Sequence, residues 1–81
     1  MKAYKIINFS GEIEAYVSGK NINQAKLMAF YSMKENGYVK RYIDVAVRRF
    51  YKYDPIAAQI RYPIGYSYAE DLLFKYEQRA H

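Results

Sequence analysis

Residues 3–17 read AYKIINFSGEIEAYV, and this stretch decides the fold. Two runs in which apolar and polar residues alternate, 3–9 and 12–17, flank Ser10 and Gly11. Glycine adopts a positive φ at low cost, as the short turn between two antiparallel strands requires. The stretch therefore predicts a β-hairpin.

The register of this hairpin follows from its turn. A two-residue loop pairs Phe9 with Glu12, and side chains then alternate between the two faces. An apolar face is formed by Tyr4, Ile6, Ile13, Ala15 and Val17. A mixed face is formed by Lys5, Ile7, Glu12, Glu14 and Tyr16. We expect the apolar face to be covered by the rest of the chain.

A helix is predicted next along the chain. Asn21 or Asn23 can cap its first turn, and it extends to about Asn36. Gly37 is placed for the left-handed residue that follows many helices. At helical spacing one stripe covers the hairpin: Ile22, Ala25, Met28, Ala29 and Met33.

Three large apolar side chains of this helix fall outside the stripe, namely Leu27, Phe30 and Tyr31. Two explanations are open. They make a wide core contact with the C-terminal segment, or they form a face for a partner or a second copy of the chain.

Residues 38–53 fit both helical spacing and strand alternation. The β-branched residues and tyrosines favour a strand over about 41–50, which would complete a sheet with the hairpin. Asp54-Pro55 is expected to break this element. Residues 55–65 then form an irregular connection, with one helical turn at 56–58.

The last element is predicted to be a helix. Ser67 and Glu70 have the spacing of a capping box, and the helix reaches about Arg79. Its amphipathic stripe comprises Tyr68, Ala69, Leu72, Leu73 and Tyr76. The expected fold is one α+β domain over residues 1–81, in the order ββαβα. A small antiparallel sheet, made of the hairpin and a third strand, is packed by two helices.

The composition limits how so short a chain is stabilised. It has 81 residues and no cysteine, so a disulfide or a cysteine-based zinc site is excluded. Eleven tyrosines and four phenylalanines favour a dense aromatic core or oligomerisation. The N-terminal residues lack a signal-peptide apolar region, and no apolar run approaches the ~20 residues that span a bilayer. We expect a soluble, cytoplasmic protein that makes no membrane contact.

Groups able to perform catalysis are scarce. The one histidine is His81, the last residue, and a terminal residue is a poor catalytic base. The four glycines are isolated, so no glycine-rich phosphate loop is present. Glu12 and Glu14 share a strand face, which is more often solvated than metal-binding. The sequence therefore predicts a protein that is not an enzyme and holds no metal or cofactor.

The basic residues are concentrated in the middle of the chain. The net charge is +5, and residues 38–62 contribute +4 of it, from six basic and two acidic residues. Aromatic residues are interleaved with these cations, and we expect a contact surface made of Arg48, Arg49, Tyr51, Lys52, Tyr53 and Arg61. Tyrosine and arginine anchor protein interfaces, and the same mixture binds single-stranded nucleic acid. A third interpretation has the tyrosines packing the sheet while the arginines extend to solvent.

Three short motifs resemble small, largely uncharacterised proteins encoded by phages and mobile elements of low-GC Gram-positive bacteria. They are MKAYK at 1–5, NQAK at 23–26 with Ala29, and YIDVAVRR at 42–49 followed by Asp54. The resemblance covers residues 1–54 and brings no catalytic residues. It implies a stoichiometric inhibitor of a host or defence-system protein, in the cytoplasm of the host cell.

We therefore expect a binding protein whose partner is a macromolecule, first of all a protein with an acidic surface. The alternative is a nucleic-acid-binding accessory protein. A homodimer through the second face of the first helix and a small-ligand site at such a dimer interface also remain open.

Overall fold

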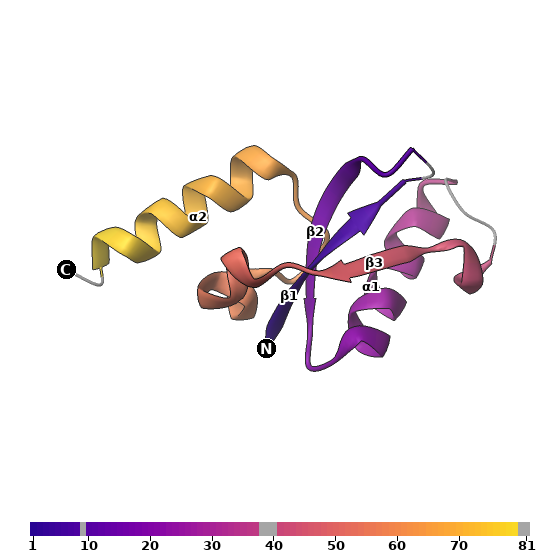
Figure 1. The fold of residues 1–81 in the computed structure, drawn as a ribbon, viewed down its shortest axis with the longest axis horizontal. Helices are drawn as coiled ribbons and strands as arrows, with labels where there is room; N and C mark the ends of the chain where they lie inside the picture. The colour runs from indigo at the N-terminus through magenta and orange to yellow at the C-terminus, as the bar shows by residue number, and fades with distance from the viewer. Residues whose placement is uncertain (9, 38–40, 80–81) are drawn as a thin grey trace.

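Three antiparallel strands form the centre of the fold, which the computed structural model describes for residues 1–8, 10–37 and 41–79. The strands are β1 (Lys2–Ile7), β2 (Ile13–Gly19) and β3 (Ala46–Arg49). The helices are α1 (Ile22–Glu35) and α2 (Tyr66–Arg79), with two 3₁₀ segments, η1 (Tyr42–Asp44) and η2 (Tyr51–Gln59). The sheet order is β2-β1-β3, so the first strand is central (Figure 1). The predicted α+β fold with a third strand beside the hairpin is confirmed.

The hairpin register agrees with the prediction over most of its length. Tyr4 lies opposite Val17 and Ile6 lies opposite Ala15, as the alternation requires. The register shifts at Ile7, which lies opposite Ile13, so β2 carries one extra residue there. Ile13 is exposed, and its expected place on the apolar face is wrong. The Glu12 carbonyl accepts a 2.9 Å hydrogen bond from the N–H of Asn8, so the predicted pairing of Glu12 with Phe9 is wrong.

Helix α1 covers one face of the sheet. The side chain of Asn21 caps it, accepting a hydrogen bond from the Gln24 N–H at 2.9 Å, and Gly37 follows it with φ 77°. The core on this face consists of Tyr4, Ile6, Val17, Ala25, Ala29, Val45 and Val47. Ile22 and Met28, which were expected in the buried stripe, are exposed. Small alanines let α1 approach the sheet closely, so the larger residues beside them remain at the surface.

A second core lies on the opposite face of the sheet, where η2 and α2 pack. It consists of Ala3, Tyr16, Tyr53, Ile56, Ala57, Ile60, Ala69 and Leu73. Tyr16 was expected on a mixed face and is instead buried in this core. Its ring lies 4.7 Å from that of Tyr53 and 5.1 Å from that of Phe50, measured between centroids. The aromatic content thus supplies the second core, as the composition indicated.

The segment between α1 and α2 differs from its predicted form. The strand expected over about 41–50 is shorter, because residues 42–44 form a 3₁₀ turn before β3 begins. Pro55 does not end an element but lies inside η2, which extends well beyond the single turn expected at 56–58. Ile64 then pairs with Tyr16 through two backbone hydrogen bonds of 2.8 and 2.9 Å. Residues 38–40, also part of the ambiguous segment, lie outside the described residues.

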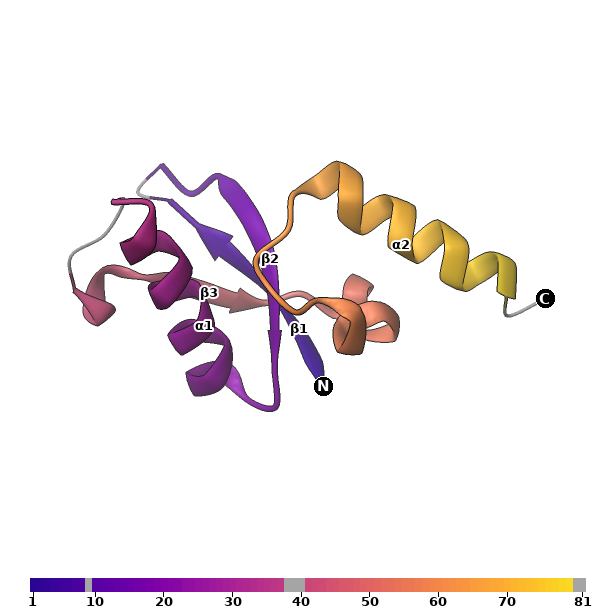
Figure 2. The same cartoon turned by 180° about the vertical axis from the view of Figure 1, so that it is seen from behind.

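Helix α2 extends away from the sheet, as Figure 2 also shows from behind. It begins at Tyr66, one residue before the predicted cap Ser67. The predicted capping box is therefore wrong, since Glu70 bonds Lys52 and Tyr53 of η2 instead. Its buried residues are Ala69 and Leu73, whereas Tyr68 and Tyr76 of the predicted stripe are exposed. Among the described helices, none has the length and apolar character needed to cross a membrane.

Candidate partner-binding surface

Two cations lie side by side on the sheet face opposite α1. β3 pairs with β1 in a register that places Arg48 directly opposite Lys5. Like charges in opposite positions destabilise a strand pair, so this arrangement needs a compensating anion or a function. The Lys5 ammonium lies 5.7 Å from the centre of the Phe50 ring, which holds it at the sheet surface. The ion pairs of the described residues include neither Lys5 nor Arg48.

Arg49 belongs to a structural network. Its guanidinium forms two hydrogen bonds with Asp54, of 2.5 and 2.6 Å, and a third with the carbonyl of Ala3 at 3.0 Å. Asp54 also accepts a 2.8 Å hydrogen bond from the N–H of Ala3. This bidentate pair joins the start of β1, the end of β3 and η2. Within the motif at 42–54, Arg49 therefore forms an ion pair with Asp54. Arg48 takes part in none of the ion pairs of the described residues.

Lys52 and Tyr53 are likewise engaged within the chain. The Lys52 ammonium lies 2.6 Å from a Glu70 carboxylate oxygen, and the Tyr53 hydroxyl donates to the same oxygen at 3.0 Å. Tyr53 is 0% exposed, so its side chain cannot contact a partner in this structure. The prediction that Tyr53 is a contact residue is therefore wrong, and Tyr53 is part of the second core.

Tyr51 and Arg61, the other two candidate residues, lie in different places. Tyr51 is 73% exposed next to the end of β3, and the Arg49 guanidinium covers one face of its ring at 4.2 Å. Arg61 lines a hollow of about 280 Å³ beside Ser18 of β2. Because β2 and β3 are opposite edges of the sheet, Arg61 does not share a surface with Arg48.

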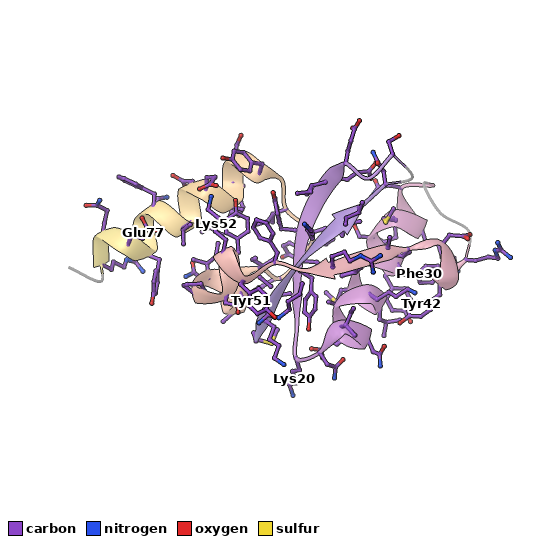
Figure 3. All side chains as sticks on the ribbon, in the orientation of Figure 1. Lys20, Phe30, Tyr42, Tyr51, Lys52 and Glu77 are labelled. Atoms are coloured by element: carbon purple, nitrogen blue, oxygen red, sulfur yellow. The ribbon has the colours of Figure 1, made fainter. Side chains whose placement is uncertain are left out.

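An aromatic and basic cluster lies on the other side of β3, next to α1. Phe30 and Tyr42 are close together (Figure 3), with ring centroids 5.8 Å apart in an edge-to-face arrangement. The Lys26 ammonium lies over the Tyr42 ring at 4.7 Å. Phe30 also packs against the first core, so within the expected dimer face only Leu27 and Tyr31 are exposed.

We define the β3 surface as Lys5, Lys26, Tyr42, Arg48 and Tyr51. Sequence reasoning identified Arg48 and Tyr51 and missed the other three as members of the surface. Lys5 could be found only from the pairing of β1 with β3, which the hairpin does not specify. Lys26 and Tyr42 are in contact because η1 packs against α1. The positions of Lys26 and Tyr42 in the sequence do not indicate this contact.

A second set of exposed aromatic residues lies on α2 and just before it. Tyr62, Tyr66, Tyr68, Phe74 and Tyr76 are all exposed. The sequence placed Tyr68 and Tyr76 in a buried stripe, but only the first half of α2 packs on the domain.

A second hollow lies beside β2 and α1. It has a volume of about 430 Å³ and is lined by Ile6, Glu14, Ala15, Ser32, Met33, Asn36 and Pro63. Among the described residues, no group of three or more potential metal-ligating His, Cys, Asp or Glu side chains occurs. His81, the only histidine, lies outside the described residues.

The carboxylates with shifted pKa belong to the ion pairs and line neither hollow. The Arg49 guanidinium lowers the pKa of Asp54 by hydrogen bonding, and Lys52 lowers that of Glu70 in the same way. Burial, together with the bond to Glu70, raises the pKa of Tyr53. These shifts are accounted for by structural contacts.

Comparison with known proteins adds no relative. No protein-family model matches the chain, and no curated protein or solved structure matches it significantly. The class defined by the structure is therefore that of a small α+β domain with a β2-β1-β3 antiparallel sheet.

Acid is expected to destabilise the fold through Asp54 and Glu70. A carboxylate whose pKa is lower in the folded state stabilises the fold above its ordinary pKa of roughly 4. That contribution is lost as the pH falls through the folded-state pKa. Thermal unfolding followed by circular dichroism should show a melting temperature that drops steeply below about pH 4.

Asp54→Asn tests this origin, because it removes the titrating group while keeping the shape of the side chain. The variant should melt at a lower temperature than the wild type at neutral pH and show a shallower decline in acid. Asp71→Asn is the control, since it removes only an exposed ion pair with Lys75 within α2. An unchanged acid slope in Asp54→Asn would contradict the assignment.

Proposed function

We propose that this chain is a small binding protein that acts without catalysis, by covering an acidic surface of a protein partner. The observation that carries the proposal is the cross-strand pair Lys5–Arg48, two neighbouring cations outside every ion pair of the described residues. A carboxylate placed between them would relieve their repulsion. Tyr51 and Tyr42 flank β3 with exposed aromatic area of the kind that anchors protein interfaces.

The resemblance of residues 1–54 to small phage proteins suggests what such binding achieves. A stoichiometric inhibitor needs a stable folded surface and no reactive groups. The β3 surface meets this need, since Lys5 and Arg48 project from a sheet with a packed core on each face. We propose that the chain inhibits a host or defence-system protein by occupying an acidic site.

A nucleic-acid-binding role is the second candidate, and the exposed Tyr51 beside cations favours it. The ion pairs weaken it. Within residues 41–61, Arg41, Arg49 and Lys52 are each paired with a carboxylate, leaving Arg48 and Arg61 on opposite edges of the sheet. The net positive segment of the sequence therefore presents few free cations together, and phosphate contacts would be few.

Differential capture distinguishes these proposals. The wild type, the double variant Lys5→Glu/Arg48→Glu and the control Lys20→Glu would be immobilised and exposed to nuclease-treated lysate of a low-GC Gram-positive bacterium. Lys20 is an exposed residue between β2 and α1, away from β3 (Figure 3). We expect the wild type and the control to retain the same proteins and the double variant to lose them.

Two outcomes would contradict the protein-binding proposal. Equal retention by all three forms would show that the β3 surface is not the contact. Retention from a parallel untreated lysate that is absent from the nuclease-treated lysate would transfer the role to nucleic acid. A salt series with a labelled single-stranded oligonucleotide would then show a steep linear loss of log affinity with log salt.

A further inference from the structure

The outer edge of β3 carries backbone groups that bond no other described residue and can therefore bond another strand. Phe50 donates its N–H to the carbonyl of Ala3 at 3.0 Å, which identifies this pair as a hydrogen-bonded one in the β1–β3 ladder. Hydrogen-bonded and non-bonded pairs alternate in an antiparallel ladder. Arg48 opposite Lys5 and Ala46 opposite Ile7 therefore also bond inward, toward β1.

Val47 and Arg49 occupy the alternate positions, so their N–H and C=O groups point away from β1. Because the sheet order is β2-β1-β3, this side of β3 is an edge of the sheet. The backbone hydrogen bonds of the described residues outside helices and strands do not involve Val47 or Arg49. In Figure 1, β3 lies in front of the other strands. The opposite edge differs, because Ile64 covers β2 at Tyr16.

We propose that an extended acidic segment of the partner adds to β3 as a further antiparallel strand. This inference rests on the proposed function and specifies its mode of recognition. Backbone hydrogen bonds to Val47 and Arg49 would supply part of the affinity, as in other cases of strand addition to a sheet edge. The side chains on the two faces of β3 then determine the sequence that fits.

The two faces of β3 call for an alternating partner. Every second side chain of the added strand would lie on the same face as Arg48 and its neighbour Lys5. These side chains should be acidic. On the other face, Val47 belongs to the core that α1 covers, against which Phe30 also packs. The intervening side chains should be apolar. The matching segment is therefore an extended peptide in which glutamate or aspartate alternates with an apolar residue.

A second copy of the chain fits this edge poorly. Two β3 strands paired about a two-fold axis would form a continuous sheet with the same face of both copies on one side. Both Lys5–Arg48 pairs would then meet on that face, and like charges in cross-strand positions oppose pairing. Charged residues on short edge strands commonly prevent such self-association. The charge thus opposes pairing with a second copy of the chain and favours an acidic strand.

The test uses a fluorescein-labelled peptide, Glu-Val-Glu-Val-Glu-Val-Glu, and the full chain, with binding measured by fluorescence anisotropy. In an antiparallel pairing, peptide residues opposite Val47 and Arg49 exchange hydrogen bonds with β3, and these are the valines. N-methylation of the valines removes the donors that face β3. N-methylation of the last three glutamates removes donors that face solvent, so this peptide is a control with the same charge and the same number of methyl groups.

We expect valine methylation to weaken binding roughly tenfold or more, and glutamate methylation to change it by less than about twofold. Arg48→Glu should also weaken binding of the unmodified peptide, whereas Lys20→Glu should not. Equal binding of the two methylated peptides would overturn strand addition, yet leave the proposed acidic contact intact if Arg48→Glu still weakened it. Failure of the wild type to bind any of these peptides would overturn the acidic contact as well.

Discussion

Replacing Tyr53 by alanine is expected to leave a large fraction of the chain unfolded in the absence of denaturant. The side chain is 0% exposed, and its ring contacts those of Tyr16 and Phe50 at centroid distances of 4.7 and 4.9 Å. Truncating a buried aromatic residue costs about 3–5 kcal/mol. A domain of this size has a total stability of about the same magnitude, so the loss would consume most of it.

Urea unfolding monitored by far-UV circular dichroism measures this effect. Tyr53→Phe keeps the ring and loses only the hydrogen bond to Glu70, so it should cost about 1 kcal/mol. Tyr62→Ala is the matched control, because this tyrosine is 71% exposed and its loss should change stability by less than about 0.5 kcal/mol. If Tyr53→Ala unfolded at the same urea concentration as Tyr62→Ala, the second core would not be formed as described.

Gly19→Ala is expected to produce the second large loss of stability. A Cβ atom at Gly19 would lie 2.7 Å from the backbone nitrogen of Ala25 and 3.0 Å from the carbonyl oxygen of Asn21. Both neighbours are backbone atoms at the start of α1, so the helix itself would have to move. Such overpacking costs about 1–3 kcal/mol, and it would displace the Asn21 cap as well.

Gly65→Ala is the matched control for this substitution. A Cβ atom at Gly65 meets nothing within 4 Å, and its φ lies outside the positive region. We therefore expect a urea midpoint close to that of the wild type, or slightly higher through a stiffer unfolded chain. Equal midpoints for Gly19→Ala and Gly65→Ala would show that α1 does not pack against the end of β2 at the described distance.

The hairpin and α1 could be predicted because their signals are local. The turn residues Ser10-Gly11 and the period-two alternation predict a hairpin in which Tyr4 lies opposite Val17, and the structure confirms this pairing. Asn21 and Gly37 mark the two ends of α1 through backbone geometry that depends on few neighbours. The bulge beside Ile7, which no local pattern indicates, moves Ile13 away from the predicted apolar face.

The structures of η2 and of the start of α2 depend on contacts between residues distant in the sequence. η2 forms where Tyr53 and Ile56 enter the second core, and this burial outweighs the tendency of Asp54-Pro55 to end an element. Glu70 has the spacing of a helix cap, but two partners on η2 bind it instead. Neither outcome could be read from spacing, because each is determined by tertiary packing.

The candidate surface was only partly predicted, because it too depends on contacts between distant residues. The sequence located Arg48 and Tyr51 within a basic, aromatic segment, but it could not assign carboxylate partners to Arg49 and Lys52. Their pairing with Asp54 and Glu70 removes them from the free charge of the surface. Lys5 joins the surface from the other end of the chain, through the register of β1 with β3.

Amide hydrogen exchange at β3, followed by NMR on the full chain, tests the central proposal most directly. In the free protein, the N–H groups of Ala46 and Arg48 bond β1 and should exchange slowly, while those of Val47 and Arg49 should exchange fast. Adding the alternating glutamate–valine peptide should slow exchange at Val47 and Arg49 and leave α2 unaffected. If the peptide bound while Val47 and Arg49 kept their fast exchange, an acidic strand would not be adding to β3.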